Sequence, residues 1–203
     1  VWIACTNPAH SLPHQSAVRA ALQAADYVVV QEAFAHTDTA AYADLLLPAS
    51  AWGEKHGTVT NSERCISHVR GAVAPPGEAR HDWQIVVDFA HRLGRRLGVD
   101  GARLFPYADP ESIYNEHRES TRGRDLDITG LSYAALDQAG PQQWPYPTGA
   151  AGGKIRLYED GVFPTPSGRA RFVATEHRIT AETPSARFPL HLNSGRLRDQ
   201  WHG

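Results

Sequence analysis

The sequence predicts an α/β fold in which helices flank a parallel sheet. Three apolar runs, at 1–5, 27–30 and 45–47, are too short for helices and suit buried strands. Segments with helical features separate these runs, and strand–helix–strand connections are right-handed crossovers that make consecutive strands parallel. We therefore expect the carboxyl ends of the three strands at one edge of the sheet, where open α/β sheets bind their ligands.

Both connecting segments carry helix signals. Ser16 is placed to cap the first helix, and Thr37 or Asp38 the second, which we expect to run to Ala43. The apolar positions at helical spacing in the first helix are Val18, Ala21, Leu22 and Ala25. The third strand should stop at Pro48, which has no N–H to give to a ladder.

Polar residues follow each predicted strand. Asn7 comes soon after the first strand, and Gln31 and Glu32 come directly after the second. The third strand leads into the segment 53–64, which is almost entirely polar and therefore cannot be core. One interpretation is an ordinary solvated loop, and the other is a ligand loop at the carboxyl edge of the sheet. We expect the three polar segments to converge in space.

Two further helices are expected beyond this loop. Asp82 is placed to cap a helix over 83–97 with one apolar face, and another helix follows Pro110. The stretch 123–147 is rich in turn residues but too aromatic for a disordered linker. We predict that it packs across a domain surface.

The pattern divides the chain into three parts. Residues 1–105 form the α/β domain, and 106–187 form an irregular α+β connecting segment that contains a predicted hairpin at 163–172. Residues 188–203 begin a new domain, whose first strand is predicted at 188–192. The chain is thus expected to hold part of one domain and the start of another.

The composition of the sequence limits the classes of function that the chain can have. The 203 residues are 41% hydrophobic and carry a net charge of −2, so no basic field suggests a nucleic-acid partner. Cys5 and Cys65 are too few and too far apart for a metal or disulfide framework, and burial as a small hydrophobe is the expected fate of such a cysteine. No apolar run approaches the roughly 20 residues of a membrane span. Because the sequence lacks Met and starts inside an apparent strand, we expect an internal fragment of a longer protein.

Several segments together resemble one enzyme family. TNP after the first strand is joined by TDTAAYADLLLPASAWGEKHGTVTNSER, PPGEARHDWQI and LNSGRLRDQWHG. This combination resembles the molybdopterin oxidoreductases that bind two molybdopterin guanine dinucleotides. Within that family the chain is most similar to assimilatory nitrate reductase, through GRDLDITGLSYAALDQAGPQQWPYP, GVFPTPSGRARF and GRLRDQWH. The resemblance implies a Rossmann-like dinucleotide-binding domain followed by the start of a β-barrel-like carboxyl-terminal domain.

The resemblance implies cofactor-binding roles for five residues of the first domain. Asn7, Gln31, Glu32, Lys55 and Asp82 match family contacts to the cofactor. An amide suits a pterin or guanine edge, a carboxylate suits guanine N–H groups or ribose hydroxyls, and an ammonium suits a phosphate or a pterin carbonyl. The alternatives are a turn Asn at position 7, a solvated lysine at position 55 and a plain helix cap at position 82. Relatives usually have Ser-Asp where this chain has Gln-Glu.

The carboxyl-terminal loop matches a family segment that wraps the phosphates and pterin of the cofactor. Its glycine allows close backbone approach, its two arginines supply bidentate donors to phosphate oxygens, and its Trp and His would pack against the ring system. The residues implied to bind the cofactor are Ser194, Gly195, Arg196, Leu197, Arg198, Asp199, Gln200, Trp201 and His202.

For the whole protein the resemblance implies reduction of nitrate to nitrite at molybdenum, in the cytoplasm, with electrons from a donor protein or reductase subunit. The molybdenum ligand and the cysteines of a [4Fe-4S] cluster are implied upstream, so we assign no catalytic residue and no metal ligand in this chain and expect it to be inactive alone. Two alternatives stay open. A formate dehydrogenase shares TNP and GEKHGTVTNSER, whereas 123–147 favours nitrate reductase. A molybdenum-free electron-transfer subunit, as in respiratory NADH dehydrogenase, has no need for Lys55 or the GRLRDQWH loop.

Overall fold

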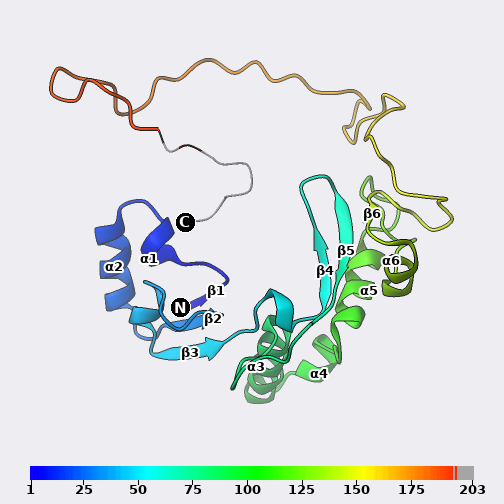
Figure 1. Ribbon diagram of the computed structural model, residues 1–203, viewed down its shortest axis with the longest axis horizontal. Helices are drawn as coiled ribbons and strands as arrows, with labels where there is room; N and C mark the ends of the chain where they lie inside the picture. The colour runs from blue at the N-terminus through cyan, green and yellow to red at the C-terminus, as the bar shows by residue number, and fades with distance from the viewer. Residues whose placement is uncertain (194, 196–203) are drawn as a thin grey trace. The chain divides into compact units, whose positions relative to one another are not determined.

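The computed structural model describes residues 1–193 and residue 195. The chain divides into two compact units, Val1–Leu157 and Tyr158–Gly203, and each is described here by itself (Figure 1). The domain boundaries predicted at 105/106 and 187/188 stay predictions.

The first unit begins with a parallel three-stranded sheet, as predicted. Its strands lie in the order β1-β2-β3, and both pairings are parallel. The strands are β1 (Trp2–Ala4), β2 (Val29–Glu32) and β3 (Leu45–Pro48). The register places Trp2 beside Val29 and Val29 beside Leu45, so these three residues form one row across the sheet.

Helical segments connect the strands. The β1–β2 connection holds α1 (Pro8–Ser11) and α2 (Gln15–Ala24), which confirms the first predicted helix, although its N-cap is His14 and the predicted cap Ser16 lies inside it. The second predicted helix is wrong, because only the 3-10 turn η1 (Ala40–Tyr42) forms between β2 and β3. Ala43 is already extended, and the backbone N–H of Asp44 donates to Val28 O at 2.9 Å. The chain enters the sheet too early for a longer helix.

One face of the sheet is covered by α2. The apolar cluster on this face contains Ile3, Ala9, Leu22, Val28 and Val30. The strand β3 departs from prediction, since Leu45 and Leu46 are 42% and 36% exposed instead of buried. Burial of a parallel strand requires a covering layer on each side, and no described residue covers β3 in that way.

The polar segment 53–64 is not a simple loop. It contains most of η2 (Trp52–Glu54) and the strand β4 (Gly57–Thr60), which pairs antiparallel with β5 (Cys65–Val69). The turn is stabilised by Asn61 Oδ1, which accepts from the backbone N–H groups of Glu63 at 2.9 Å and Cys65 at 3.0 Å. Thr58, Val59 and Thr60 are β-branched, and this strand preference explains why a polar segment forms a ladder. A third strand, β6 (Gln142–Gln143), pairs with β5.

Two long helices confirm their predictions, except that the first is capped by His81 and the predicted cap Asp82 is its first helical residue. The helix α3 (Asp82–Leu97) ends where Gly98 adopts a left-handed conformation with φ 67°. The helix α5 (Pro110–Ser120) is capped by Asp109, whose carboxylate accepts from Ser112 N at 2.7 Å. The short helices α4 (Gly101–Leu104) and α6 (Tyr133–Ala139) were not predicted.

A second core joins α5, α6 and the antiparallel sheet. Its buried residues are Ile66, Tyr114, Ile128, Leu131 and Leu136. Trp144 and Tyr146 pack against the same cluster, so the aromatic stretch 123–147 packs on the body of the unit as expected.

The second unit has no helix or strand among its described residues, 158–193 and 195. The hairpin predicted at 163–172 is therefore wrong. Phe163 N instead donates to Gly168 O at 2.9 Å and closes a turn, while Pro164 and Pro166 have no N–H for a ladder. The strand predicted at 188–192 is also absent, and Leu192 is fully exposed. A strand forms only beside a partner strand, and the described residues supply none there.

Candidate cofactor site

The carboxyl edge of the parallel sheet brings three predicted site residues to one carboxylate. Gln31 lies near the end of β2, Lys55 follows η2, and Asp82 opens α3. Gln31 Nε2 donates to Asp82 Oδ1 at 2.7 Å, and Lys55 Nζ lies 3.2 Å from Asp82 Oδ2. Asp82 therefore connects segments that are 51 and 27 residues away from it in sequence.

Backbone pairing explains why α3 starts at this edge. Arg80 N donates to Pro48 O at 3.0 Å, and Ser50 N donates to Arg80 O at 2.9 Å. The chain at Arg80 thus runs as a short parallel extension beside the end of β3. The next two residues, His81 and Asp82, are delivered to the edge where β2 also ends.

A buried acceptor at this edge has no partner. Gln31 is 2% exposed, and its Oε1 makes no hydrogen bond with any described residue. The amide orientation follows from its contact, because only Nε2 donates to the Asp82 carboxylate. An unsatisfied buried oxygen costs about 1–3 kcal/mol. A ligand N–H or O–H group at this position would remove that cost.

Cys5 also faces Asp82, which the sequence did not predict. Its Sγ lies 3.8 Å from Asp82 Oδ1, and the residue is exposed rather than buried as a small hydrophobe. Partial burial, and then the negative charge of Asp82, raise the pKa of the Cys5 thiol. The thiol therefore stays protonated and donates weakly to the carboxylate.

A buried serine and a histidine complete the edge, and sequence reasoning missed both. Ser50 is 2% exposed, and its Oγ lies 2.8 Å from His81 Nδ1. Burial lowers the pKa of His81, the positive charges of His56 and Lys55 lower it further, and Asp82 opposes them. The sequence signal for His81 is its position directly before Asp82, which is a predicted helix cap.

We expect the stability of the chain to fall as the pH drops below about 6.5, in part because of His81. Its pKa in the folded state lies below the ordinary value of 6.5, so the unfolded chain binds the proton more readily. The stabilising contribution of neutral His81 is complete above pH 6.5, the ordinary pKa, and is lost as the pH falls toward the pKa of the folded state. Urea unfolding of the 203-residue chain at pH 7.5 and 5.5 measures the change. His81→Gln should reduce the difference, and His177→Gln, in the second unit, should not.

Asn7 and Glu32 make hydrogen bonds to other residues. Asn7 Oδ1 accepts from Thr39 N at 3.0 Å and from Thr39 Oγ1 at 2.6 Å. Glu32 Oε1 accepts from the backbone N–H groups of Ala33 at 2.7 Å and Phe34 at 3.4 Å. Asn7 follows the carboxyl end of β1 and Glu32 is the last residue of β2, so both lie at the expected edge, but their cofactor roles and a shared cleft with Lys55 stay predictions.

Most of the predicted carboxyl-terminal loop lies outside the described residues. This applies to Ser194 and to 196–202. Gly195 is described, and a Cβ built on it would have no neighbour within 4 Å. Its role, like that of the rest of the loop, stays a prediction.

The chemistry of the edge suits a nucleotide-like group. Lys55 lines a pocket of about 280 Å³ beside His56 and β4. The amino terminus of the 16-residue helix α3 adds a partial positive charge, which favours anionic oxygens. The free acceptor of Gln31 suits N–H or O–H groups. These features fit a cofactor that carries both phosphates and N–H-rich rings.

A parallel sheet with such groups at its carboxyl edge is typical of nucleotide-binding α/β proteins. Residues 1–92 match the family model described as "Molybdopterin oxidoreductase". This part of the chain belongs to the molybdopterin oxidoreductase family.

Similarity to individual relatives extends over the whole chain. The chain is 40% identical to a nitrate reductase of Synechocystis, covering 100% of the chain and 28% of that protein. It is 41% identical to a nitrate reductase of Klebsiella oxytoca, over 100% of the chain and 23% of the relative. It is 37% identical to the assimilatory nitrate reductase catalytic subunit of Bacillus subtilis, over 99% of the chain and 28% of the relative. The chain thus spans about a quarter of the length of these relatives.

A solved structure shares the fold. Acetylene hydratase from Pelobacter acetylenicus superposes with a TM-score of 0.55 at 24% identity, over 82% of this chain and 21% of that protein. In the described part of the chain, no helix has the length and apolar character to cross a membrane.

Proposed function

We propose that the full-length protein is a molybdenum-dependent nitrate reductase that reduces nitrate to nitrite. The observation that carries this proposal is the similarity of the whole chain to nitrate reductases from several organisms, one of them an assimilatory catalytic subunit. A second candidate is formate oxidation, because the chain is also 38% identical to the F420-dependent formate dehydrogenase subunit alpha of Methanocaldococcus jannaschii.

In this proposal the first unit holds one end of a molybdopterin guanine dinucleotide, in a Rossmann-like domain. Gln31 Oε1 accepts from a ring N–H or a ribose hydroxyl, and Lys55 donates to a phosphate or a pterin carbonyl. Asp82 keeps both side chains in place through the contacts described above. The bound molybdenum supplies oxygen-atom transfer, while the residues of this chain bind and orient the group that carries it.

The remaining cofactor contacts come from Asn7, Glu32 and the carboxyl-terminal loop. Arg196 and Arg198 grip phosphate oxygens, and Gly195 lets the backbone approach closely. Residues 188–203 begin a β-barrel-like domain of the full-length protein. These assignments rest on the match of the residues to family motifs.

The setting of the full-length enzyme follows from the same proposal. It works in the cytoplasm, receives electrons from a donor protein through a [4Fe-4S] cluster, and binds its second guanine dinucleotide elsewhere in the chain. One relative, from Desulfovibrio desulfuricans, is a periplasmic nitrate reductase at 34% identity, so the location requires its own test. Fractionation of the native cells, followed by activity staining, distinguishes the two compartments.

The decisive experiment is metal and nucleotide analysis of the full-length protein. We expect one molybdenum and two guanine dinucleotides per chain, with nitrite formed from nitrate in the presence of a reduced viologen dye. Formate oxidation without nitrate reduction would assign the second candidate function. A folded protein without molybdenum would contradict both enzyme proposals and support a structural subunit.

Lys55→Ala in the full-length protein should weaken cofactor retention. A charge-assisted hydrogen bond contributes roughly 1.5–3 kcal/mol, which corresponds to a loss of about 10-fold to 100-fold in affinity. Guanine released on denaturation, measured per folded chain after extensive dialysis, reports the occupancy. Lys154→Ala removes the other lysine of this chain and serves as the control, with unchanged occupancy expected. Equal retention in both variants would contradict the assigned role of Lys55.

A further inference from the structure

Thr39 connects the loop after β1 to the chain between β2 and β3. Its side chain is fully buried. The hydroxyl Oγ1 accepts from Ala9 N at 3.0 Å and donates to Asn7 Oδ1 at 2.6 Å, while Thr39 N donates to the same Asn7 oxygen at 3.0 Å. Thr39 lies 32 residues after Asn7 in the sequence, so a distant part of the chain holds the loop after β1 in place.

These contacts replace the usual cap of the short helix α1. Asn7 occupies the N-cap position, where an asparagine oxygen ordinarily accepts from the backbone N–H groups of the first turn. The Asn7 side chain makes no such bond, and Ala9 N donates to Thr39 Oγ1 instead. Helix capping therefore does not account for the asparagine at this position.

The same contacts fix which end of the Asn7 amide is free. Thr39 N can only donate, so the Asn7 atom that it contacts must be the carbonyl oxygen Oδ1. Asn7 is half-buried, and its Nδ2 makes no hydrogen bond with any described residue. Asn7 therefore offers two free N–H groups, and a ligand atom that binds there must be an acceptor.

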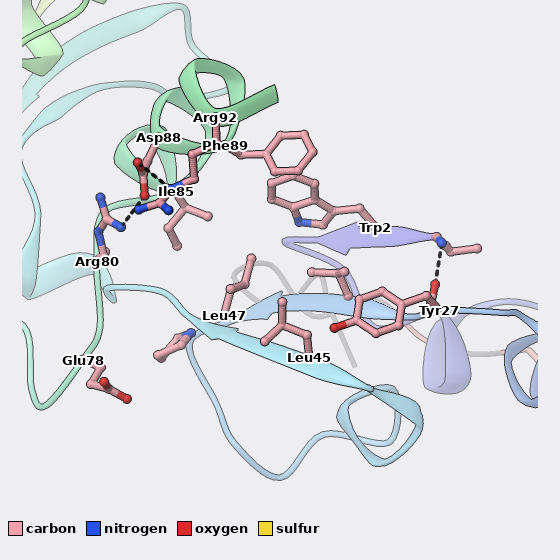
Figure 2. A pocket seen from close by; sticks show the side chains of 13 residues that line it. Trp2, Tyr27, Leu45, Leu47, Glu78, Arg80, Ile85, Asp88, Phe89 and Arg92 are labelled. Atoms are coloured by element: carbon pink, nitrogen blue, oxygen red, sulfur yellow. Dashed lines mark hydrogen bonds and ion pairs between the residues drawn. The ribbon is translucent and has the colours of Figure 1, made fainter. Parts of the chain in front are cut away.

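Asn7 lies at the same edge as the candidate cofactor site. Cys5 contacts Asp82 at 3.8 Å, and Asn7 follows Cys5 by two residues, which span at most about 7 Å. The apolar groove of about 580 Å³ between the sheet and α3 is a different region, because neither Asn7 nor Thr39 lines it (Figure 2). The free N–H groups of Asn7 thus belong to the polar edge and not to the apolar groove.

We propose that Thr39 is a positioning residue for the cofactor, because it orients Asn7 so that Nδ2 donates to an acceptor oxygen, either of a phosphate or of a ring carbonyl. This inference rests on the proposed cofactor binding at this edge and is independent of whether nitrate or formate is the substrate. It gives the two site amides opposite polarity, since Gln31 has a free acceptor and Asn7 a free donor. A ligand that carries both an N–H group and an acceptor oxygen matches this arrangement.

Cofactor retention in variants of the full-length protein tests the role of Thr39. Thr39→Val keeps the shape of the side chain but removes the hydroxyl, so Asn7 loses one of the two hydrogen bonds that orient it. We expect the affinity for the cofactor to fall about 3-fold to 10-fold, the effect of one neutral hydrogen bond. Thr39→Ser keeps the hydroxyl and should retain the cofactor. Guanine released on denaturation, measured per folded chain after extensive dialysis, reports the occupancy.

Thr121→Val is the matched control. Thr121 is 7% exposed, and its Oγ1 donates to Arg118 O at 2.6 Å and accepts from Ile128 N at 3.0 Å. Its hydroxyl thus makes the same two kinds of contact, at the carboxyl end of α5. Both valine variants should lower the thermal midpoint, but only Thr39→Val should lose guanine. Equal guanine retention in the two valine variants would overturn the proposal, as would a Thr39→Ser variant that retains no more guanine than Thr39→Val.

Asn7→Asp tests the free donor without removing the contacts to Thr39. The new carboxylate still accepts from Thr39 N and Oγ1, so the variant should fold, but it has no N–H group for the cofactor. We expect a loss of about 10-fold or more in affinity. Wild-type guanine retention in Asn7→Asp would contradict the proposal, whereas absence of guanine from the wild type would contradict the proposed function itself.

The salt dependence of the Asn7→Asp loss identifies the acceptor oxygen. If the oxygen belongs to a phosphate, the carboxylate repels it, and 1 M salt should reduce the loss by screening the two charges. If the oxygen belongs to a ring carbonyl, the loss should be the same at low and high salt. Either result supports the donor role of Asn7, provided that the loss is present at low salt.

Discussion

Replacing Asp82 by alanine is expected to destabilise the 203-residue chain by roughly 1–4 kcal/mol. The larger part comes from Gln31, whose Nε2 would lose its acceptor at a position that is 2% exposed, at a cost of about 1–3 kcal/mol. The ion pair with Lys55 adds at most about 1 kcal/mol, because both side chains are about one third exposed and solvent screens the pair. Urea unfolding of the variant and the wild type measures the difference.

Asp82→Asn separates the two contributions. The amide oxygen of asparagine still accepts from Gln31 Nε2, so most of the stability should be retained, while the charge opposite Lys55 is lost. The free energies of unfolding of Asp82→Ala and Asp82→Asn should therefore differ by most of the cost of leaving Gln31 Nε2 without an acceptor. If the two variants were equally unstable, the ion pair would be the main contribution, and the buried amide would not depend on Asp82.

Leu131→Ala should cost about 2–5 kcal/mol, the largest effect expected for any single substitution proposed for this chain. Leu131 is fully buried between α5, α6 and β5, where it packs with Tyr114 and Leu136. Truncation removes apolar contacts and leaves a cavity that the surrounding side chains fill only in part. The midpoint of urea unfolding reports the loss.

Leu126→Ala is the matched control for this core variant. Leu126 lies five residues earlier in the same irregular stretch but is 43% exposed. Its truncation should change the free energy of unfolding by less than about 1 kcal/mol. Similar losses in the two variants would mean that the second core does not carry the stability of the unit.

Elements with strong local signals were predicted well from the sequence. The helix α3 has one apolar face and ends at a glycine in the left-handed conformation, and α5 has an aspartate cap followed by proline. These signals act within a few residues of the element that they define. The three parallel strands were also recognisable, because short apolar runs between helices have few alternative structures.

Elements that depend on distant partners were predicted poorly. The β4–β5 hairpin looked like a polar loop, because its stability comes from cross-strand pairing and from α5 and α6 packing behind it. The strand at 188–192 was expected from an apolar run alone, but a strand also needs a neighbour. The exposure of Leu45 has the same origin, since burial depends on a layer that the strand itself does not encode.

The candidate site was predictable in part. Gln31, Lys55 and Asp82 were selected because they match family motifs, and they meet in the structure. Ser50 and His81 were not selected, although both lie within the matched segments, because their contact crosses 31 residues and has no signal in the sequence. Such a pair becomes visible only when the backbone at Arg80 is known to lie beside the end of β3.

The unpartnered oxygen of Gln31 has a consequence for how the enzyme is assembled in the cell. Under the proposed role of Gln31, a newly synthesised chain folds with this acceptor unsatisfied, and binding of the cofactor would remove that cost and stabilise the loaded state by mass action. Loading would then act as a checkpoint during maturation. Chains that fail to acquire cofactor would open more readily at this edge and be exposed to proteases, whereas loaded chains would be protected.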